Sequence, residues 1–122
     1  MWHGWADPQV TAQNSTIYYN SVLKTVGKTA DDSIALFMLP GVYHYQGGPG
    51  PDRFDRMAAI ESWVERGTKP TRIVASHQTN GKIDRTRPLC PFGQVARWNG
   101  TGNTNDEANF SCVEEIVDTT VR

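Results

Sequence analysis

Apolar residues recur at helical spacing in two stretches of the chain. The first covers residues 11–26 and is followed by Gly27, and the second covers residues 52–66 and is followed by Gly67. Such a stripe with a glycine after it predicts an amphipathic helix with a C-cap. The residues of the two stripes are Ile17, Tyr18, Val22, Leu23 and Val26, then Phe54, Met57, Ile60, Trp63 and Val64. We therefore expect two helices that each pack one face against the fold.

Between the two helices lies a continuous apolar run, residues 33–39, which ends at Pro40-Gly41. A run of this length without alternation is typical of a strand buried on both faces, as in a parallel sheet covered by helices. The segment 42–51 is too rich in glycine and proline for regular structure, and residues 72–77 predict one more strand. The order helix, buried strand, loop, helix indicates the α/β class.

The last third of the sequence shows no regular pattern beyond Asn80-Gly81, where Pro88, Pro91 and a polar stretch at 99–109 follow. The chain then supplies only about two strands, and an isolated pair of strands is marginal in water. We expect residues 1–122 to be one partial domain. Its sheet would be completed by homo-oligomerisation or by a missing N-terminal half of a parent protein.

Composition excludes several classes of partner. The net charge is −1, which offers no basic footprint for nucleic acid and no polybasic segment for a membrane surface. The longest apolar stretch, residues 34–39, is too short to cross a bilayer. The opening residues lack the pattern of a signal peptide. We expect a soluble chain without nucleic-acid or membrane partners, and its cellular location stays open.

The two cysteines, Cys90 and Cys112, both fall in the loop-rich last third. A bridge between them would close a loop of about 22 residues and stabilise the fold by roughly 3 kcal/mol on the chain-entropy account. The residues alone favour a disulfide, with two free buried thiols as the alternative.

The order of two further residues matches a known catalytic arrangement. Asp7 precedes the first helix, and His44 lies in the loop after the buried strand. In α/β-hydrolases the triad runs serine, then Asp or Glu, then His, with the histidine in a late loop. Asp7 would orient the imidazole, while His44 would take the proton from a serine and return it to the leaving alcohol. The alternative is a turn residue and a surface histidine.

The sequence motifs in and around these segments resemble those of the tannase and feruloyl esterase family, from Trp2 to about Val113. The segments are His3-Gly4-Trp5-Ala6-Asp7-Pro8, Pro40-Gly41-Val42-Tyr43-His44 leading into 47–51, and then 62–67, 85–91 and 109–112. The resemblance implies the C-terminal part of an α/β-hydrolase fold, with the lid upstream, from a family that is typically secreted. It implies cleavage of phenolic acid esters such as ferulate or gallate, with Asp7 as triad acid and His44 as triad base. It also implies a C-terminal disulfide between Cys90 and Cys112.

Two departures from the family pattern stand out. Tyr45 occupies the position where the family usually has a cysteine bonded to the residue before the nucleophilic serine. The chain also has no Gly-x-Ser-x-Gly segment, and a nucleophile should precede Asp7. Its serines read as cap, helix-surface or turn residues: Ser15, Ser21, Ser33, Ser62, Ser76 and Ser111. The nucleophile would have to come from another polypeptide or from an upstream segment.

Other residues favour structural roles. His3 and His77 lack metal-ligand spacing, so no zinc site and no cofactor are expected. The glycines at 47–50 lack a P-loop lysine and predict a flexible loop that carries His44. Arg85 and Arg87 are expected in a structural ion pair, for example with Asp84. Three aromatic residues near Asp7 and His44 in the sequence would line either a substrate pocket or the core: Trp5, Tyr43 and Tyr45.

Three functional readings follow. The leading one is a carboxylic ester hydrolase segment that supplies the triad Asp and His. The alternative is a non-catalytic, self-associating fragment. The third is weak hydrolysis in which His44 acts as a general base on water, without an acyl-enzyme.

Overall fold

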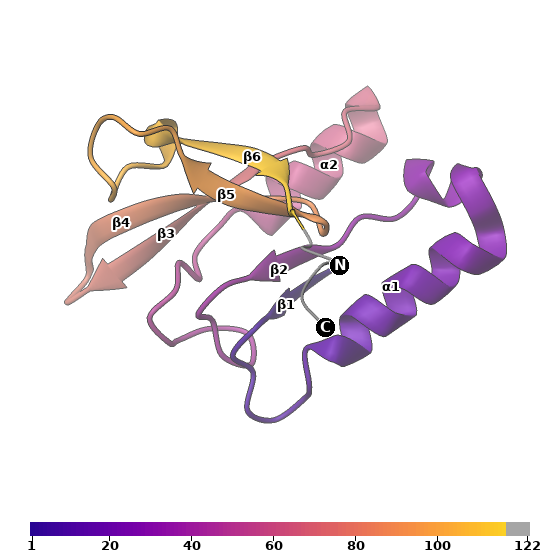
Figure 1. Ribbon diagram of the computed structural model, residues 1–122, viewed down its shortest axis with the longest axis horizontal. Coiled ribbons are helices and arrows are strands. Elements are labelled where there is room, and N and C mark those ends of the chain that lie inside the picture. Colours follow the sequence, from indigo (N-terminus) through magenta and orange to yellow (C-terminus); the bar gives the residue numbers. More distant parts are fainter. Residues whose placement is uncertain (117–122) are drawn as a thin grey trace.

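Three two-stranded sheets and two α-helices make up residues 1–116, the part of the chain that the computed structural model describes. The parallel pair β1–β2 lies in the middle, with α1 along one side and two antiparallel hairpins on the other (Figure 1). The elements in chain order are β1 (Trp2–Gly4), α1 (Gln13–Val26), the 3₁₀ helix η1 (Gly27–Asp32), β2 (Phe37–Leu39), α2 (Arg56–Arg66), β3 (Ile73–Thr79), β4 (Lys82–Leu89), β5 (Gln94–Trp98), the 3₁₀ helix η2 (Glu107–Asn109) and β6 (Phe110–Glu114). The predicted α/β class is confirmed.

The predicted buried strand is present as β2, although it covers only Phe37–Leu39 of the apolar run. It pairs in parallel with β1, with His3 opposite Met38. Residues 35–39 are all buried, and since successive side chains point to opposite sides of a strand, both faces are covered. Phe37 and Leu39 pack towards α2 and the β3–β4 hairpin, whereas Leu36 and Met38 pack towards α1. The expectation of a strand covered on both faces is confirmed.

The helix boundaries differ by a few residues from the prediction. α1 begins at Gln13 rather than at residue 11, and Gly27 follows it with φ 80°. α2 begins at Arg56 rather than at residue 52, because the carboxylate of Asp55 accepts a hydrogen bond from the Ala58 N–H and caps the helix there. Gly67 ends α2 in the left-handed conformation, as its position predicted.

The apolar stripes of the two helices are only partly covered: Trp63 of α2 packs against the core, whereas other members of the stripes are exposed. Ile17 is 66 % exposed and Val64 is 77 % exposed. Within residues 1–116, the central sheet has one pair of three-residue strands, so each helix finds little surface to cover. Further large apolar side chains exposed on the helices are Tyr18, Val26, Met57 and Ile60.

The last third is regular, and the expectation of irregular structure there is wrong. β3 and β4 form an antiparallel hairpin around Asn80-Gly81, whose φ angles are 51° and 78°. Two positive φ angles in a two-residue loop are the condition for a type I′ turn, for which Asn-Gly is a preferred sequence. β5 and β6 form a second hairpin, and the predicted disulfide between Cys90 and Cys112 links β6 to the end of β4. Asn80-Gly81 therefore connects two strands of a hairpin and does not mark the end of regular structure.

Gly81→Ala is expected to destabilise the protein by about 1 kcal/mol, because an L-residue at this positive φ is strained. A β-carbon at Gly81 would meet no atom within 4 Å, so the cost is confined to the backbone. The free energy of unfolding in urea measures it, with Asn80→Gly as the control that keeps the turn permissive. Equal stability of Gly81→Ala and wild type would contradict the turn assignment.

No helix among the described residues is long and apolar enough to span a bilayer.

Candidate active site

The parallel pairing of β1 and β2 brings Asp7 and His44 together. The ends of both strands point the same way, and the turn after β1 is fastened to the turn after β2 by the backbone hydrogen bond from the Ala6 N–H to the Val42 carbonyl, 3.0 Å. Asp7 and His44 follow in these two turns. The Nδ1 atom of His44 lies 2.9 Å from the Oδ2 atom of Asp7. Two residues separated by 37 positions are thus hydrogen-bonded at one edge of the sheet.

The Asp7 carboxylate is fully enclosed and bonded on both oxygens. Its side chain is 0 % exposed. Oδ1 accepts hydrogen bonds from the N–H groups of Gln9, 2.8 Å, and Val10, 3.0 Å. Oδ2 accepts from two imidazoles, those of His44 and His3. Burial raises the pKa of Asp7, but the backbone bonds from Val10 and Gln9 and then the two imidazoles outweigh it, so the pKa lies well below its usual range.

This depressed pKa predicts a pH dependence of stability. An aspartate in the unfolded chain has a pKa of about 3.9. The contribution of ionised Asp7 to the free energy of unfolding is therefore complete above that pH, and it is lost as the pH falls towards the lower pKa of the folded state. Urea unfolding between about pH 6 and about pH 3 should show the stability gap between wild type and Asp7→Asn narrowing as the pH falls. A gap that stays constant, or widens in acid, would contradict this reading.

His44 has the geometry of a general base. Because the Asp7 carboxylate can only accept, Nδ1 of His44 carries a proton and Nε2 of the neutral ring carries the lone pair. Nε2 makes no hydrogen bond to any of residues 1–116, and the side chain is 41 % exposed. The ring also meets the edge of Tyr45, with centroids 5.7 Å apart. A lone pair presented at an open edge is suited to accept a proton from a bound reactant.

The loop that carries His44 is held closed by its own backbone. The Tyr43 N–H donates to the Gly47 carbonyl at 3.1 Å, and the Gly50 N–H donates to the Gly41 carbonyl at 2.9 Å. A β-carbon at Gly50 would lie 2.0 Å from the Pro40 carbonyl oxygen. The two ends of the loop can therefore approach this closely only because residue 50 is a glycine. The glycine-rich segment therefore gives His44 a defined position rather than a loose tether.

The aromatic residues near the site are exposed rather than part of the core. Trp5, Tyr43 and Tyr45 all present their rings partly to solvent. Of the three, Tyr45 lines the hollow of about 230 Å³ that also contains Asp7 and His44. This hollow is completed by Trp2, His3 and Val10.

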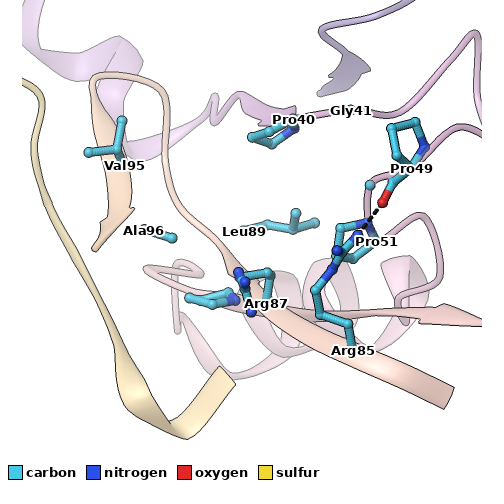
Figure 2. Close-up of a pocket in the computed structure, with 11 residues that line it drawn as sticks. Pro40, Gly41, Pro49, Pro51, Arg85, Arg87, Leu89, Val95 and Ala96 are labelled. Atoms are coloured by element: carbon cyan, nitrogen blue, oxygen red, sulfur yellow. Dashed lines mark hydrogen bonds between the residues drawn. The ribbon is translucent and has the colours of Figure 1, made fainter. Parts of the chain in front are cut away.

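A second, larger cavity of about 480 Å³ lies between β4, β5 and the His44 loop (Figure 2). Arg85 reaches across it and donates to the Pro49 carbonyl. The guanidinium of Arg87 lies 4.0 Å from the ring centroid of Phe110. The expected ion pair with Asp84 is wrong, since neither arginine forms a salt bridge within residues 1–116. Asp84 lies on the other face of the strand and binds His77 at 2.6 Å.

Arg85→Ala is expected to destabilise the protein by about 1.5 kcal/mol and to loosen the loop, because a hydrogen bond from a charged donor to the Pro49 carbonyl is lost. Amide hydrogen exchange at Gly50, whose N–H is bonded to Gly41, reports the loosening. Lys82→Ala, at an exposed position of the same strand, is the control. Unchanged exchange at Gly50 would show that the loop does not depend on Arg85.

His3 is the residue that the sequence reasoning missed. Its spacing in the sequence does not match that of a metal ligand, and among the described residues no group of three His, Cys, Asp or Glu side chains could hold a metal ion. In the structure its Nε2 atom lies 2.8 Å from Oδ2 of Asp7. The spacing of four residues within His3-Gly4-Trp5-Ala6-Asp7 was a signal, although only the turn after β1 brings the two side chains together.

Comparison with known proteins places the chain in a family. The family model described as tannase and feruloyl esterase matches residues 1–113. The chain belongs to this family. Over 115 residues it is 42 % identical to a mono(2-hydroxyethyl) terephthalate hydrolase of Piscinibacter sakaiensis, covering 92 % of this chain and 19 % of the relative. It is 37 % identical to an uncharacterized esterase of Xanthomonas campestris, covering 91 % of this chain and 25 % of the relative.

Solved structures agree with this assignment. The chain superimposes on an esterase from Aspergillus oryzae with a TM-score of 0.75 and 27 % identity, covering 92 % of this chain and 26 % of that one. These structural neighbours are esterases of the α/β-hydrolase type. The chain therefore spans only about a fifth to a quarter of the length of the proteins it matches.

Proposed function

We propose that the chain provides the acid, Asp7, and the base, His44, of a carboxylic ester hydrolase. Residues 1–122 would form one partial α/β-hydrolase domain without the nucleophile and the lid. The observation that carries the proposal is the 2.9 Å hydrogen bond from His44 Nδ1 to Asp7, with Nε2 unpartnered among residues 1–116 at the end of a parallel strand pair. The chain order of the two residues is that of an α/β-hydrolase triad.

The reaction follows from the placement of protons. Nε2 of His44 takes the proton of a serine hydroxyl as the serine oxygen attacks the ester carbonyl, and the imidazolium gives it to the departing alcohol. Water then attacks the acyl-serine with the same base, which releases the acid and restores the serine. The buried carboxylate of Asp7 stabilises the charged imidazole in both steps.

The serine belongs to another polypeptide or to an upstream segment in this proposal. Of the serines in residues 1–116, none is hydrogen-bonded to His44, and Ser15 is bonded to His3 instead. The chain covers only 19 % and 25 % of the length of the two relatives named above. A second copy of the chain, or the remainder of a longer protein, would complete the sheet and the site.

The proposed substrates are small esters of aromatic acids. The family is that of tannases and feruloyl esterases, and the relative with 42 % identity is named for mono(2-hydroxyethyl) terephthalate. Ferulate and gallate esters share with that compound an aromatic acyl group. The aromatic ring of Tyr45 beside His44 is placed to contact such a group.

The test is hydrolysis of methyl ferulate, of mono(2-hydroxyethyl) terephthalate and of a short p-nitrophenyl ester by the purified chain. The wild type is compared with His44→Ala and with His77→Ala, a control histidine that is also paired with an aspartate. Hydrolysis lost in His44→Ala and after a serine-directed phosphonate supports a recruited serine. His44-dependent hydrolysis that resists the phosphonate indicates water as the nucleophile. Equal rates in wild type and His44→Ala would rule the proposal out.

The second candidate is a non-catalytic, self-associating fragment. It is favoured by the exposed apolar stripes of α1 and α2, which include Ile17 and Val64. Light scattering of the purified chain should then show an oligomer that Ile17→Lys with Val64→Lys dissociates. A strictly monomeric wild type would exclude this candidate.

A further inference from the structure

A second histidine shares the carboxylate oxygen that binds His44. The Nε2 atom of His3 lies 2.8 Å from Asp7 Oδ2, and its Nδ1 atom lies 2.7 Å from the hydroxyl of Ser15. The His3 side chain is only 11 % exposed, against 41 % for His44. Ser15 belongs to the first turn of α1, so the contact joins this helix to the end of β1.

The surroundings of His3 fix where its proton lies. Nε2 faces two acceptors, the Asp7 carboxylate and the Val10 carbonyl at 3.2 Å. Neither of them can donate, so Nε2 carries the proton. In the neutral ring Nδ1 is then an acceptor, and the Ser15 hydroxyl donates to it. A chain of donors therefore runs from Ser15 through His3 to Asp7.

The two oxygens of Asp7 are held in different ways. Oδ1 is fixed by two backbone N–H groups, those of Gln9 and Val10. Oδ2 depends on two side chains, and one of them, His44, is at the solvent edge. Without His3, the buried oxygen would keep only this exposed partner, and an enclosed acceptor with a missing donor draws in water or a shifted side chain.

We propose that His3, itself held by Ser15, is a positioning residue that fixes Asp7 Oδ2 and thereby keeps His44 in the Nδ1–H tautomer. The role of this tautomer in ester hydrolysis rests on the function proposed above. The positioning itself does not, because it concerns only the hydrogen bonds within this chain.

The same three residue types invite a different assignment, with Ser15 as a nucleophile activated by His3. This would require a substrate to reach a serine hydroxyl that donates to a ring only 11 % exposed. His44, by contrast, presents its free nitrogen at an open hollow. The positioning role is therefore favoured, and the experiment separates the two.

The experiment records ring ¹⁵N chemical shifts of the histidines at neutral pH in the full chain. His3→Gln places an amide nitrogen where Nε2 was and keeps the bond to Asp7, so His44 should remain in the Nδ1–H form. His3→Asn is too short for that bond, so His44 should shift towards the mixture of tautomers of a solvent-exposed histidine. Ser15→Ala removes only the outer partner and should give a smaller shift. If His3→Asn does not fold, the His44 chemical shifts of Ser15→Ala are compared with those of His3→Gln. The inference then requires a larger departure from the wild-type shifts in Ser15→Ala.

Several outcomes would overturn the inference. One is that the ring ¹⁵N chemical shifts of His44 stay at their wild-type values in both His3→Asn and Ser15→Ala. Another is a phosphonate adduct on Ser15, which would make that serine the nucleophile.

A tautomer shift in an inactive chain would support the positioning role while the proposed function fails. His44-dependent hydrolysis with no tautomer shift would do the reverse. Where hydrolysis is present, His3→Asn should lower kcat by about 10- to 100-fold with KM little changed, and His3→Gln should restore it.

Discussion

Asp7→Asn is expected to lower kcat for methyl ferulate by about 10⁴-fold in any preparation of the chain that hydrolyses it, the size of the loss that this change causes in the Ser-His-Asp triad of a serine protease. The structure gives the reason. The N–H groups of Gln9 and Val10 require an acceptor at the Oδ1 position, so the asparagine oxygen takes that place. Its NH₂ group then faces Nδ1 of His44, which must become an acceptor and carry its proton on Nε2. The lone pair needed for the reaction is then absent.

The control for this prediction is a second aspartate–histidine pair on the same chain. Asp84 binds Nδ1 of His77 at 2.6 Å in the β3–β4 hairpin. Asp84→Asn makes the same chemical change away from the hollow and should leave kcat within about twofold of the wild type. Comparable losses in the two variants would mean that Asp7 acts only through stability.

Removal of the disulfide is expected to cost about 3 kcal/mol of unfolding free energy on the chain-entropy account. Cys90 and Cys112 are 22 positions apart and join the end of β4 to β6. Their bond holds the two hairpins together where the described part of the chain has few buried side chains, and Cys90 itself is buried. The double variant Cys90→Ala, Cys112→Ala should therefore unfold at a clearly lower urea concentration.

Reduction provides an independent check. Dithiothreitol should lower the urea midpoint of the wild type to that of the double variant and leave the variant unchanged. Equal midpoints for oxidised and reduced wild type would show that the bridge adds no stability.

Several features of the fold follow from local sequence because they depend on local physics. Gly27 and Gly67 end their helices, since a glycine adopts positive φ without a steric cost. Residues 35–39 are buried on both faces because each of these five side chains is apolar. Asn80-Gly81 is a local hairpin signal of the same kind, because both residues tolerate the positive φ angles of a type I′ turn.

Other elements cannot be derived from local pattern. β1 has three residues, and such a strand exists only because β2 offers it a partner. β5 and β6 likewise depend on each other, and the disulfide fastens them to β4. Their short strands contain too few alternating positions to be distinguished from loop.

The candidate site divides in the same way. The chemical groups of the site can be read from the sequence: a carboxylate before the first helix, an imidazole after the buried strand, and two cysteines able to pair. The contacts between these groups follow only from the three-dimensional fold: Asp7 and His44 meet at 2.9 Å, His3 binds the same oxygen, and Arg85 reaches the loop instead of an acid. Chemical identity belongs to each residue, whereas a hydrogen bond depends on distance and direction. Here the parallel register of two short strands sets both.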